Sequence, residues 1–216
     1  MQACNAAPSG VYLLTPDTVD TDTLLAATQA ALAAGIGWLQ YRNKQAPLPL
    51  RHAQAQALRA LTRRHGAKLI VNDDAALAAA VRADGVHLGR NDVGAAAARL
   101  QLGAAAVLGC SAYDAFDRAE AAWQSGADYV AFGSVFASTV KPLAVRVPLA
   151  LLTRARRAGM QVAAIGGIDA TNIGRVAAAG AHAAALISAV YDAPDPGAAA
   201  AALIAAFDAG SREFIH

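Results

Sequence analysis

The sequence predicts a closed (β/α)₈ barrel, and three observations support that prediction. Short apolar runs alternate with longer segments of helical period eight times along the 216 residues. The runs are apolar on both faces, as parallel strands covered by helices must be. No linker or shift in composition divides the chain, whose length lies near the lower end of the roughly 200 to 400 residues that this fold occupies. An open doubly wound sheet is the alternative, but its roughly six strands would leave two of the eight units unplaced.

The strands are expected from the apolar runs, each bounded by glycine or small polar residues. The first contains "VYLLT", the second "WLQYR" and the fourth "GVHL". In chain order, the eight strands are expected over residues 11–15, 38–42, 68–72, 85–88, 106–111, 129–132, 162–167 and 184–188. The turns "AGIGWL", "SGADYV" and "AGAHAA" precede the second, sixth and eighth strands, and their glycines are typical of a point where a helix stops and a strand begins.

The helices are expected from apolar residues that recur every three or four positions. The first begins near Asp22, where Leu24, Thr28 and Leu32 share one face, and the second begins near Leu50 with a similar stripe. The remaining helices are expected over residues 74–82, 93–102, 115–125, 148–158, 170–179 and 196–207.

Composition limits the classes of partner. With 56% apolar residues and a formal net charge of +2, the chain can bury a large core and offers no strong field for nucleic acid or an anionic membrane. Its two cysteines form neither a disulfide framework nor a metal cluster. The N-terminus lacks a signal-peptide pattern, and no apolar run is long enough to span a bilayer. We therefore expect a cytoplasmic protein with a small-molecule partner, with homo-oligomer formation left open. We expect one domain over residues 1–216, with short flexible tails at 1–9 and 209–216.

Polar residues collect where the predicted strands end, which favours an enzyme. Active sites of barrels lie at the carboxyl ends of the strands. The second strand ends in "QYRNK", the third in "ND", the fourth runs into "GRND", and the fifth ends at Ser111. The turns at the opposite ends of the strands carry mostly Gly, Ala and Asp. A barrel that served only as a scaffold would have no reason for this asymmetry.

Two aspartates follow neighbouring strands. Asp73 comes after the third strand and Asp92 after the fourth, so both carboxylates can face one point above the barrel. Two carboxylates with open remaining positions suit Mg²⁺, which keeps waters and phosphate oxygens as its other ligands. The alternative for Asp73 or Asp74 is a cap on the next helix. The pairing with Asp92 favours the metal.

Two cations follow the second strand. Arg42 and Lys44 stand two positions apart and would project the same way from an extended chain. Arginine offers a bidentate fork and lysine a point charge, a combination that suits a diphosphate. Gln40 lies on the same side, and Asn72 is similarly placed to bond a neutral atom of a ligand. Solvated surface cations are the alternative, which a position directly after a buried strand disfavours.

Glycines end the seventh strand. Gly166 and Gly167 in "AIGGID" allow backbone N–H groups to approach an anion. The loops after the seventh and eighth strands form the usual phosphate site of a (β/α)₈ barrel, and Ser188 ends the eighth strand. The sequence therefore predicts a second anion site, built from backbone, so that the expected ligands are small phosphorylated molecules.

His87 and Cys110 are expected to be structural. His87 lies within the fourth strand, where a packed histidine is more common than a catalytic one. Cys110 lies inside a strand with no histidine placed to activate it, so a thiol nucleophile is not expected.

The ordered motifs of the chain resemble those of the thiamine phosphate synthases over about residues 11–190. They are "YLLTPD", "LQYRNK", "LIVNDD", "ADGVHLGRND", "GCSAYD", "GADYVAFGSVFASTVKP", "AIGGIDATN" and "LISAV". Members of that family are (β/α)₈ barrels that join a hydroxymethylpyrimidine diphosphate to a thiazole phosphate. The products are thiamine phosphate and diphosphate.

The resemblance assigns roles to individual residues. The pyrimidine diphosphate would contact Gln40, Arg42, Lys44, Asn72, Ser111 and Lys141. The thiazole phosphate would be surrounded by Ser138, Thr139, Gly166, Gly167, Ile187 and Ser188. Mg²⁺ would bind Asp73 and Asp92, and catalysis would fall to Arg42, Lys44, Ser111 and Lys141. In the family, diphosphate is thought to leave first, so that the thiazole nitrogen captures a pyrimidine-methyl cation without any protein nucleophile.

Three departures from the family pattern lie beside these positions. Val140 stands where the family usually has a second hydroxyl in Thr-x-Thr-Lys, and Thr139 is the adjacent hydroxyl. Asp74 replaces a usual Arg, and Arg90–Asn91 replaces a usual Gln-Glu. These differences bear on affinity more than on the reaction.

Two other functions compete with the synthase. The related thiazole tautomerases share the barrel but resemble "SxH" after the fifth strand, where this chain has Tyr113. A barrel that binds a phosphorylated ligand without chemistry would be expected to have lost Arg42, Lys141 or an aspartate. Neither expectation matches the sequence, which favours the synthase.

Overall fold

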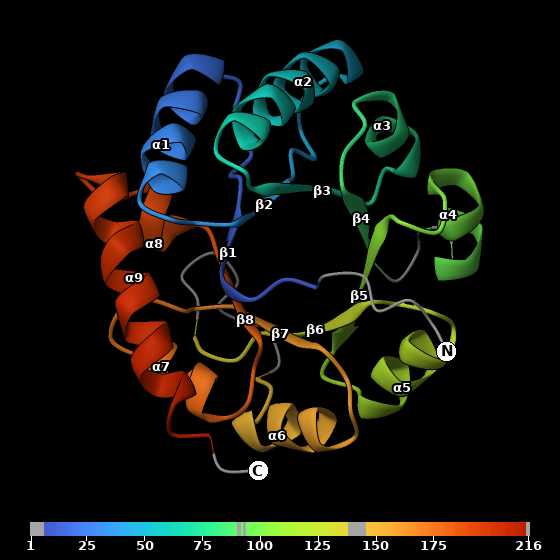
Figure 1. Ribbon diagram of the computed structural model, residues 1–216, viewed down its shortest axis with the longest axis vertical. Coiled ribbons are helices and arrows are strands. Elements are labelled where there is room, and N and C mark those ends of the chain that lie inside the picture. Colours follow the sequence, from blue (N-terminus) through green and yellow to red (C-terminus); the bar gives the residue numbers. More distant parts are fainter. Residues whose placement is uncertain (1–6, 90–91, 93, 138–145, 215–216) are drawn as a thin grey trace.

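Eight parallel strands close into a barrel in the computed structural model, which describes residues 7–89, 92, 94–137 and 146–214. Each strand pairs with the next one along the chain, and β8 (Ala183–Leu186) pairs with β1 (Gly10–Leu14). Figure 1 looks down the ring of strands, with the helices arranged around it. The closed ring confirms the predicted fold and excludes the open doubly wound sheet.

The other strands and the helices lie close to their expected positions. The strands are β2 (Trp38–Tyr41), β3 (Lys68–Asn72), β4 (Gly85–Leu88), β5 (Val107–Tyr113), β6 (Tyr129–Gly133) and β7 (Val162–Ile165). The helices are α1 (Thr21–Ala33), α2 (Leu48–Arg64), α3 (Ala75–Ala80), α4 (Ala95–Leu102), α5 (Phe116–Gln124), α6 (Leu149–Arg157), α7 (Ile173–Ala178), α8 (Ser188–Tyr191) and α9 (Pro196–Ser211).

The fifth strand is expected to end at Ser111, but β5 continues to Tyr113 through an irregularity in its pairing with β6. Three other boundaries also differ for physical reasons. β7 ends at Ile165 rather than at Gly167, because Gly166 and Gly167 have φ of 108° and 64°, which an extended strand does not allow. Ser188 begins the short helix α8 instead of ending β8, and four residues are too few to show helical periodicity. α9 extends to Ser211, past residue 209, where the sequence predicted a tail.

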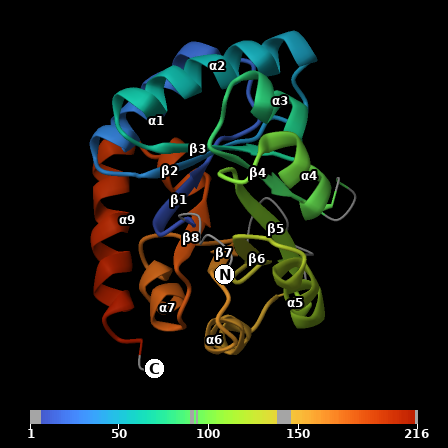
Figure 2. The ribbon, with the colours of Figure 1, turned by 45° about the vertical axis from the view of Figure 1, so that its right-hand side comes forward.

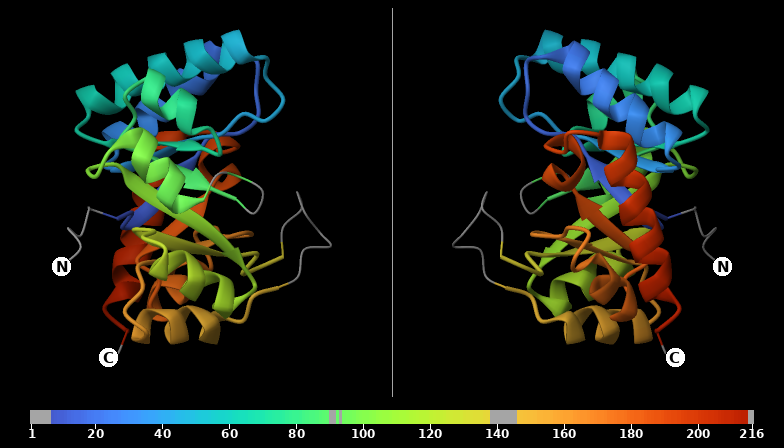
Figure 3. Two further views of the ribbon diagram at one scale, coloured as in Figure 1. Left: turned by 90° about the vertical axis from the view of Figure 1, so that its right-hand side faces the viewer. Right: turned by 90° about the vertical axis from the view of Figure 1, so that its left-hand side faces the viewer.

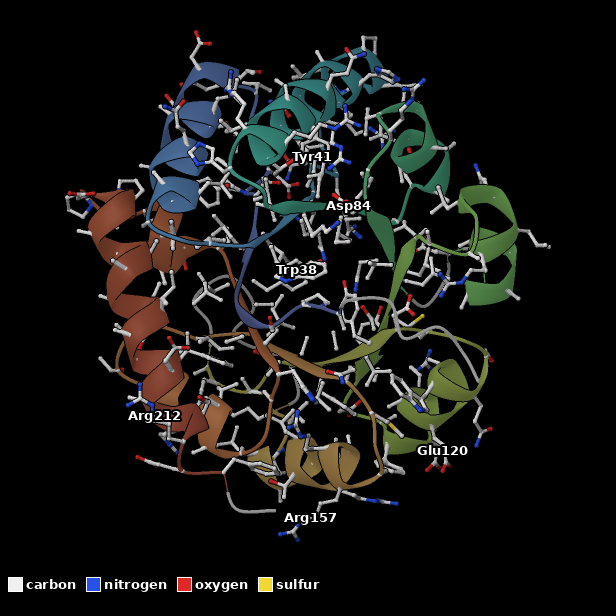
Figure 4. All side chains as sticks on the ribbon, viewed as in Figure 1. Trp38, Tyr41, Asp84, Glu120, Arg157 and Arg212 are labelled. Atoms are coloured by element: carbon white, nitrogen blue, oxygen red, sulfur yellow. The ribbon has the colours of Figure 1, made fainter. Side chains whose placement is uncertain are left out.

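Two apolar layers stabilise the barrel. The outer layer lies between the strands and the helices, and Figures 2 and 3 show the helices around the strands, with α9 alongside α1 and α7. The inner layer fills the lumen, where Tyr12, Trp38, Ile70 and Tyr129 pack with small alanines of β7 and β8. Figure 4 shows Trp38 inside the ring of strands. The lumen is therefore a packed core below the mouth of the barrel.

Carboxylates at the amino ends of the strands stabilise the barrel. Asp84 accepts a hydrogen bond from the backbone N–H of Leu69 at 2.9 Å and pairs with Arg59 at 2.5 Å and Lys68 at 3.0 Å. Asp128 performs the same role beside β5. These aspartates, unlike Asp73 and Asp92, tie strands to helices and lie away from the predicted site.

Among the helices of the described residues, none combines the length and apolar character needed to cross a bilayer.

Candidate active site

Asp73 projects from a tight turn at the carboxyl end of β3. Its φ is 64°, in the left-handed region that aspartate tolerates better than most residues, and its N–H donates to the carbonyl of His87 at 2.7 Å. The next residue, Asp74, caps α3 by accepting from the N–H of Leu77 at 2.8 Å. Helix capping therefore belongs to Asp74, and the Asp73 carboxylate is available to the mouth of the barrel.

Asp92 meets Asp73 above β4. Asp92 Oδ2 accepts from the N–H of Gly89 at 2.6 Å. A methyl group placed on Gly89 would lie 3.1 Å from Asp92 Oδ2 and 3.6 Å from both Asp73 Oδ1 and the Tyr113 hydroxyl. The two aspartates thus lie together, as expected from their positions, and the hydroxyl of Tyr113 at the end of β5 borders the same small space.

The two carboxyl groups differ in pKa. Burial raises the pKa of Asp92, and the neighbouring Asp73 raises it further. Burial acts on Asp73 in the same direction, but hydrogen bonds with Lys44 and Asp92 outweigh it and hold the pKa of Asp73 below its ordinary value. Lys44 Nζ lies 2.9 Å from Asp73 Oδ2. Negative charge is therefore concentrated at Asp73.

An oxygen-only donor set of this kind fits Mg²⁺. The paired carboxylates repel one another, and among the described residues the ammonium of Lys44 offsets them. Mg²⁺ commonly takes one or two protein carboxylates and completes its shell with water and phosphate oxygens. Within the described residues, no group of three or more His, Cys, Asp or Glu is arranged to hold a metal. Asp73 and Asp92 are the carboxylates that meet at this point.

Arg42 and Lys44 diverge instead of projecting together. The Arg42 guanidinium pairs with Asp17 Oδ2 at 2.8 Å, and Lys44 reaches Asp73. Asp17 Oδ1 also accepts from the backbone N–H of Lys44 at 2.7 Å. β2 ends at Tyr41, so the extended geometry that would align the two cations is lost between them. Both remain at the mouth, joined through Asp17, which the sequence analysis did not single out.

Buried amides hold the loop that carries these cations. Asn43 Nδ2 donates to the carbonyl of Thr18 at 2.6 Å and to Gln54 Oε1 at 3.0 Å. Gln54 Oε1 also accepts from the Tyr41 hydroxyl at 2.9 Å. This network fixes Asn43 between Arg42 and Lys44. Sequence reasoning missed it, because a polar residue in a loop gives no sign of burial.

A third cation lies beside Lys44. Arg51 on α2 lines a pocket of about 40 Å³ together with Lys44, Asn72 and Asp73. Its guanidinium is 3.7 Å from Asp74, and its Nε has no hydrogen-bond partner among the described residues. Asn72, the last residue of β3, thus lines the same pocket as the two cations.

Gln40 and Ser111 face the lumen. Gln40 Nε2 donates to the Tyr12 hydroxyl at 2.9 Å, and Ser111 Oγ lies 2.9 Å from His87 Nε2. His87 is 7% exposed, and burial lowers its pKa to about 4. The prediction of a packed histidine is confirmed. Burial also raises the pKa of Cys110 to about 11, which keeps the thiol protonated at neutral pH.

The turn after β7 presents backbone amides. The carbonyl of Gly166 accepts from the N–H of Phe136 at 3.0 Å, and the carbonyl of Gly167 accepts from Asn172 Nδ2 at 2.9 Å. A trans peptide directs its N–H away from its carbonyl, so the following N–H groups point away from these partners. A Cβ on Gly167 would lie 2.2 Å from the carbonyl oxygen of Ala137. Only glycine fits this close approach.

The segment after β8 faces the glycine turn. Ile165 of β7 pairs in register with Ala185 of β8, so the residues that follow each strand are neighbours. Ile187 is half-buried and Ser188 is exposed at the start of α8. The structure therefore brings together Gly166, Gly167, Ile187 and Ser188.

Several predicted positions lie outside the described residues. They are Ser138, Thr139, Val140 and Lys141 in the loop after β6, and Arg90 and Asn91 before Asp92.

The chain is similar to known proteins along most of its length. The family model described as thiamine monophosphate synthase matches residues 11–190. The thiamine-phosphate synthase of Thiobacillus denitrificans is 51% identical over 207 residues, covering 95% of this chain and 98% of that protein. The thiamine-phosphate synthase of an Azoarcus species is 56% identical over 189 residues, covering 87% of this chain and 91% of that protein. Among solved structures, thiamine phosphate pyrophosphorylase from Pyrococcus furiosus matches with a TM-score of 0.82 at 32% identity, over 92% of this chain and 95% of that one.

Sequence, fold and site lead to the same family. The matched segment holds Lys44 and both aspartates on one side of the mouth, and the glycine turn after β7 on the other. The solved relative shares the barrel over nearly the whole chain. The chain belongs to the thiamine monophosphate synthase family.

Proposed function

We propose that the protein joins 4-amino-2-methyl-5-hydroxymethylpyrimidine diphosphate to 4-methyl-5-(2-phosphooxyethyl)thiazole, or its carboxylate form, to give thiamine phosphate and diphosphate; the carboxylate form also releases carbon dioxide. The observation that carries the proposal is the meeting of Asp73, Asp92 and Lys44 at the mouth of a barrel whose relatives are thiamine-phosphate synthases. The protein is then a transferase of a pyrimidinylmethyl group.

The segments after β2 to β5 bind the pyrimidine diphosphate in this proposal. Lys44 and Arg42 approach the diphosphate oxygens, and Asn72 bonds a neutral atom. The residues that would hold Mg²⁺ are Asp73 and Asp92; when bound, the ion supplies positive charge beside the departing diphosphate. Lys44 adds to this stabilisation because its charge is fixed before the bond breaks.

The bond changes need no nucleophile from the protein. The bond between the pyrimidine methylene carbon and the diphosphate oxygen breaks, and its electron pair leaves with diphosphate. The thiazole nitrogen then supplies the pair for the new carbon–nitrogen bond. Cys110, whose thiol is protonated at neutral pH, plays no part.

The turn after β7 and the start of α8 bind the thiazole phosphate. Glycine N–H groups and the Ser188 hydroxyl offer neutral donors to the phosphate oxygens. Ile187 packs beside the thiazole ring. Lys141, Ser138 and Thr139 are assigned to the two substrates on the family resemblance alone.

Thiazole tautomerase and a non-catalytic barrel are not favoured. Tyr113 replaces the histidine that a tautomerase would use, and its hydroxyl lies near the paired aspartates. A barrel without chemistry would not need Lys44 and the aspartates in one place. We also propose a single barrel domain that works in the cytoplasm on small phosphorylated substrates, with Mg²⁺ as its cofactor.

The direct test mixes purified protein, both substrates and Mg²⁺, and measures released diphosphate and thiamine phosphate. We expect equal amounts of both products, and no thiamine phosphate when either substrate is omitted. An active relative assayed in parallel controls for the substrates. Absence of both products in the presence of an active control would refute the proposal.

A further inference from the structure

Five side chains form a continuous hydrogen-bonded chain across the lumen. In order they are Gln40, Tyr12, Tyr129, His87 and Ser111, contributed by β2, β1, β6, β4 and β5. Gln40 Nε2 donates to the Tyr12 hydroxyl at 2.9 Å, and the two tyrosine hydroxyls are 3.0 Å apart. His87 Nδ1 is 3.0 Å from the Tyr129 hydroxyl, and His87 Nε2 is 2.9 Å from Ser111 Oγ. We call these residues the lumen chain.

Both ends of the lumen chain are assigned to the pyrimidine substrate, but its middle is not. Gln40 and Ser111 are proposed substrate contacts, whereas Tyr12 and Tyr129 are each 1% exposed. The middle residues can therefore affect substrate binding only through Gln40 and Ser111.

The number of protons on each group fixes which partner donates in every hydrogen bond of the lumen chain, and we call this order its direction. Tyr12 accepts from Gln40, so its single proton goes to Tyr129, its other partner among the described residues. Tyr129 then donates to His87 Nδ1. A neutral imidazole with an accepting Nδ1 carries its proton on Nε2, which donates to Ser111.

This direction leaves Ser111 free to donate to the pyrimidine diphosphate and Gln40 free to accept from it. Ser111 Oγ accepts from His87, so the serine proton remains for the substrate. At the other end, Gln40 Oε1 has no partner among the described residues. The site then offers a donor at Ser111 for a diphosphate oxygen and an acceptor at Gln40 for the pyrimidine amino group. If every hydrogen bond ran the other way, Ser111 would present an acceptor to the substrate and Gln40 would present a donor.

The lumen is shaped to hold this arrangement. A Cβ on Gly109 would lie 2.1 Å from the Tyr129 ring, so glycine is required for the ring to lie there. Tyr12 and Tyr129 meet edge to face, with centroids 6.0 Å apart at 81°, and His87 lies 5.5 Å from the Tyr129 ring. Packed rings fix the hydroxyl positions, so reversal needs a flip of the Gln40 amide and a shift of every proton.

We propose that Tyr12, Tyr129 and His87 are positioning residues that orient Gln40 as acceptor and Ser111 as donor for the pyrimidine diphosphate. This inference rests on the proposed function for its substrate. The direction of the lumen chain is a property of the free protein and is tested separately.

The kinetic test is a double-mutant cycle between Tyr129→Phe and Ser111→Ala. Tyr129→Phe removes the donor that fixes the imidazole tautomer, so kcat/KM for the pyrimidine diphosphate should fall about tenfold. The KM for the thiazole phosphate should stay within about twofold of the wild type. In the Ser111→Ala background, Tyr129→Phe should change kcat/KM by less than about twofold. Additive effects of the two changes would overturn the positioning role.

Matched variants separate the loss of an orienting hydrogen bond from a general effect of removing a tyrosine hydroxyl. Tyr191→Phe removes a buried hydroxyl that bonds Thr28 at 2.7 Å outside the lumen, and it should leave kcat/KM unchanged. Tyr12→Phe removes the acceptor that holds the Gln40 amide but leaves Tyr129 able to donate to His87, so its effect on kcat/KM should persist in the Ser111→Ala background. Loss of the Tyr12→Phe effect in the Ser111→Ala background would overturn the role of Tyr12 in orienting Gln40.

The tautomer itself is measured by nitrogen NMR on protein labelled with ¹⁵N-histidine, without substrate. His87→Gln identifies the His87 signals. We expect a protonated Nε2 and an unprotonated Nδ1 in the wild type, and loss of this single tautomer in Tyr129→Phe. A protonated Nδ1 with an unprotonated Nε2 in the wild type would overturn the inference. An inactive protein with the expected tautomer would refute the proposed function alone.

Discussion

The mouth of the barrel has two halves that differ in the groups they offer to an anionic ligand. After β2 to β5, these groups are charged side chains: Lys44 Nζ lies 2.9 Å from Asp73, and Asp92 shares the same small space. We call this the side-chain half. After β6 to β8, in what we call the backbone half, the turn is built on Gly166 and Gly167, and the proposed phosphate donors are mainly peptide N–H groups.

The two halves are sensitive to different kinds of substitution. In the side-chain half, an isosteric substitution removes a charge and leaves the fold intact. In the backbone half, deleting a side chain can remove the Ser188 hydroxyl but not the peptide donors, whereas an added Cβ on Gly167 meets the Ala137 carbonyl at 2.2 Å. The two halves should therefore respond to opposite kinds of mutation, with effects on different substrates.

The largest effect is expected at Asp92. Asp92→Asn keeps the shape but removes a charge from the proposed metal site, so kcat should fall about 100-fold or more and the Mg²⁺ needed for half-maximal rate should rise. Steady-state rates across a Mg²⁺ titration measure both. Asp114→Asn changes an exposed carboxylate after β5 and serves as the control. Unchanged Mg²⁺ dependence in Asp92→Asn would remove Asp92 from the metal site.

The next effect is expected at Gly167. In Gly167→Ala, the Cβ clash and the φ of 64° should displace the turn at a cost of about 2 kcal/mol, so the Kd for the thiazole phosphate should rise about 30-fold. Calorimetric titration measures the Kd. Gly37→Ala is the control, since nothing lies within 4 Å of its new Cβ. Wild-type affinity in Gly167→Ala would place the thiazole phosphate elsewhere.

A smaller effect is expected at Lys44. Lys44→Gln removes one partly exposed cation, so the Kd for the pyrimidine diphosphate should rise about tenfold, and added salt should reduce the difference. Lys68→Gln removes a cation that pairs with Asp84 at the other end of the barrel and should leave this Kd unchanged. Equal losses in the two variants would mean that net charge, and not the position of Lys44, decides affinity.

The smallest effect on activity, but a clear one on stability, comes from acid. Burial lowers the pKa of His87 from 6.5 to about 4. Between about pH 6.5 and about pH 4, the imidazole is therefore protonated in the unfolded chain but neutral in the folded one. Stability from this group is present at neutral pH and is lost as the pH falls. Between about pH 7 and about pH 5 the loss should be about 2 kcal/mol.

Urea unfolding of the wild type and His87→Gln at both pH values isolates the share of His87, because burial also lowers the pKa of His182 to about 4 and that group acts in both proteins. His87→Gln should lose less stability on acidification than the wild type, whereas His65→Gln, at an exposed position after α2, should match the wild type. Identical acid sensitivity in the wild type and His87→Gln would show that other groups account for the effect.

The fold could be predicted because parallel strands buried on both faces are recognisable as apolar runs. The eight expected runs correspond to the eight strands, and Gly35, Gly126 and Gly180 adopt positive φ in the turns that precede three of them. The short helix α8 could not be predicted, because it makes a single turn and needs no repeating stripe.

The site could be predicted only in part. The expected meeting of Asp73 with Asp92 required only that neighbouring strands end together. The pairing of Lys44 with Asp73 depends on a left-handed turn at an aspartate, which sequence does not reveal. The buried roles of Tyr12 and Tyr129 depend on which face of each strand points inward. The register of the strands decides which face points inward, and an apolar run does not reveal that register.

The most direct test of the two-halves account measures both ligands on both variants. Calorimetry would give the Kd of the pyrimidine diphosphate and of the thiazole phosphate for Lys44→Gln and Gly167→Ala. We expect each variant to lose affinity for one ligand only: Lys44→Gln for the pyrimidine diphosphate and Gly167→Ala for the thiazole phosphate. Similar losses for both ligands in either variant would contradict the division of the mouth into two halves.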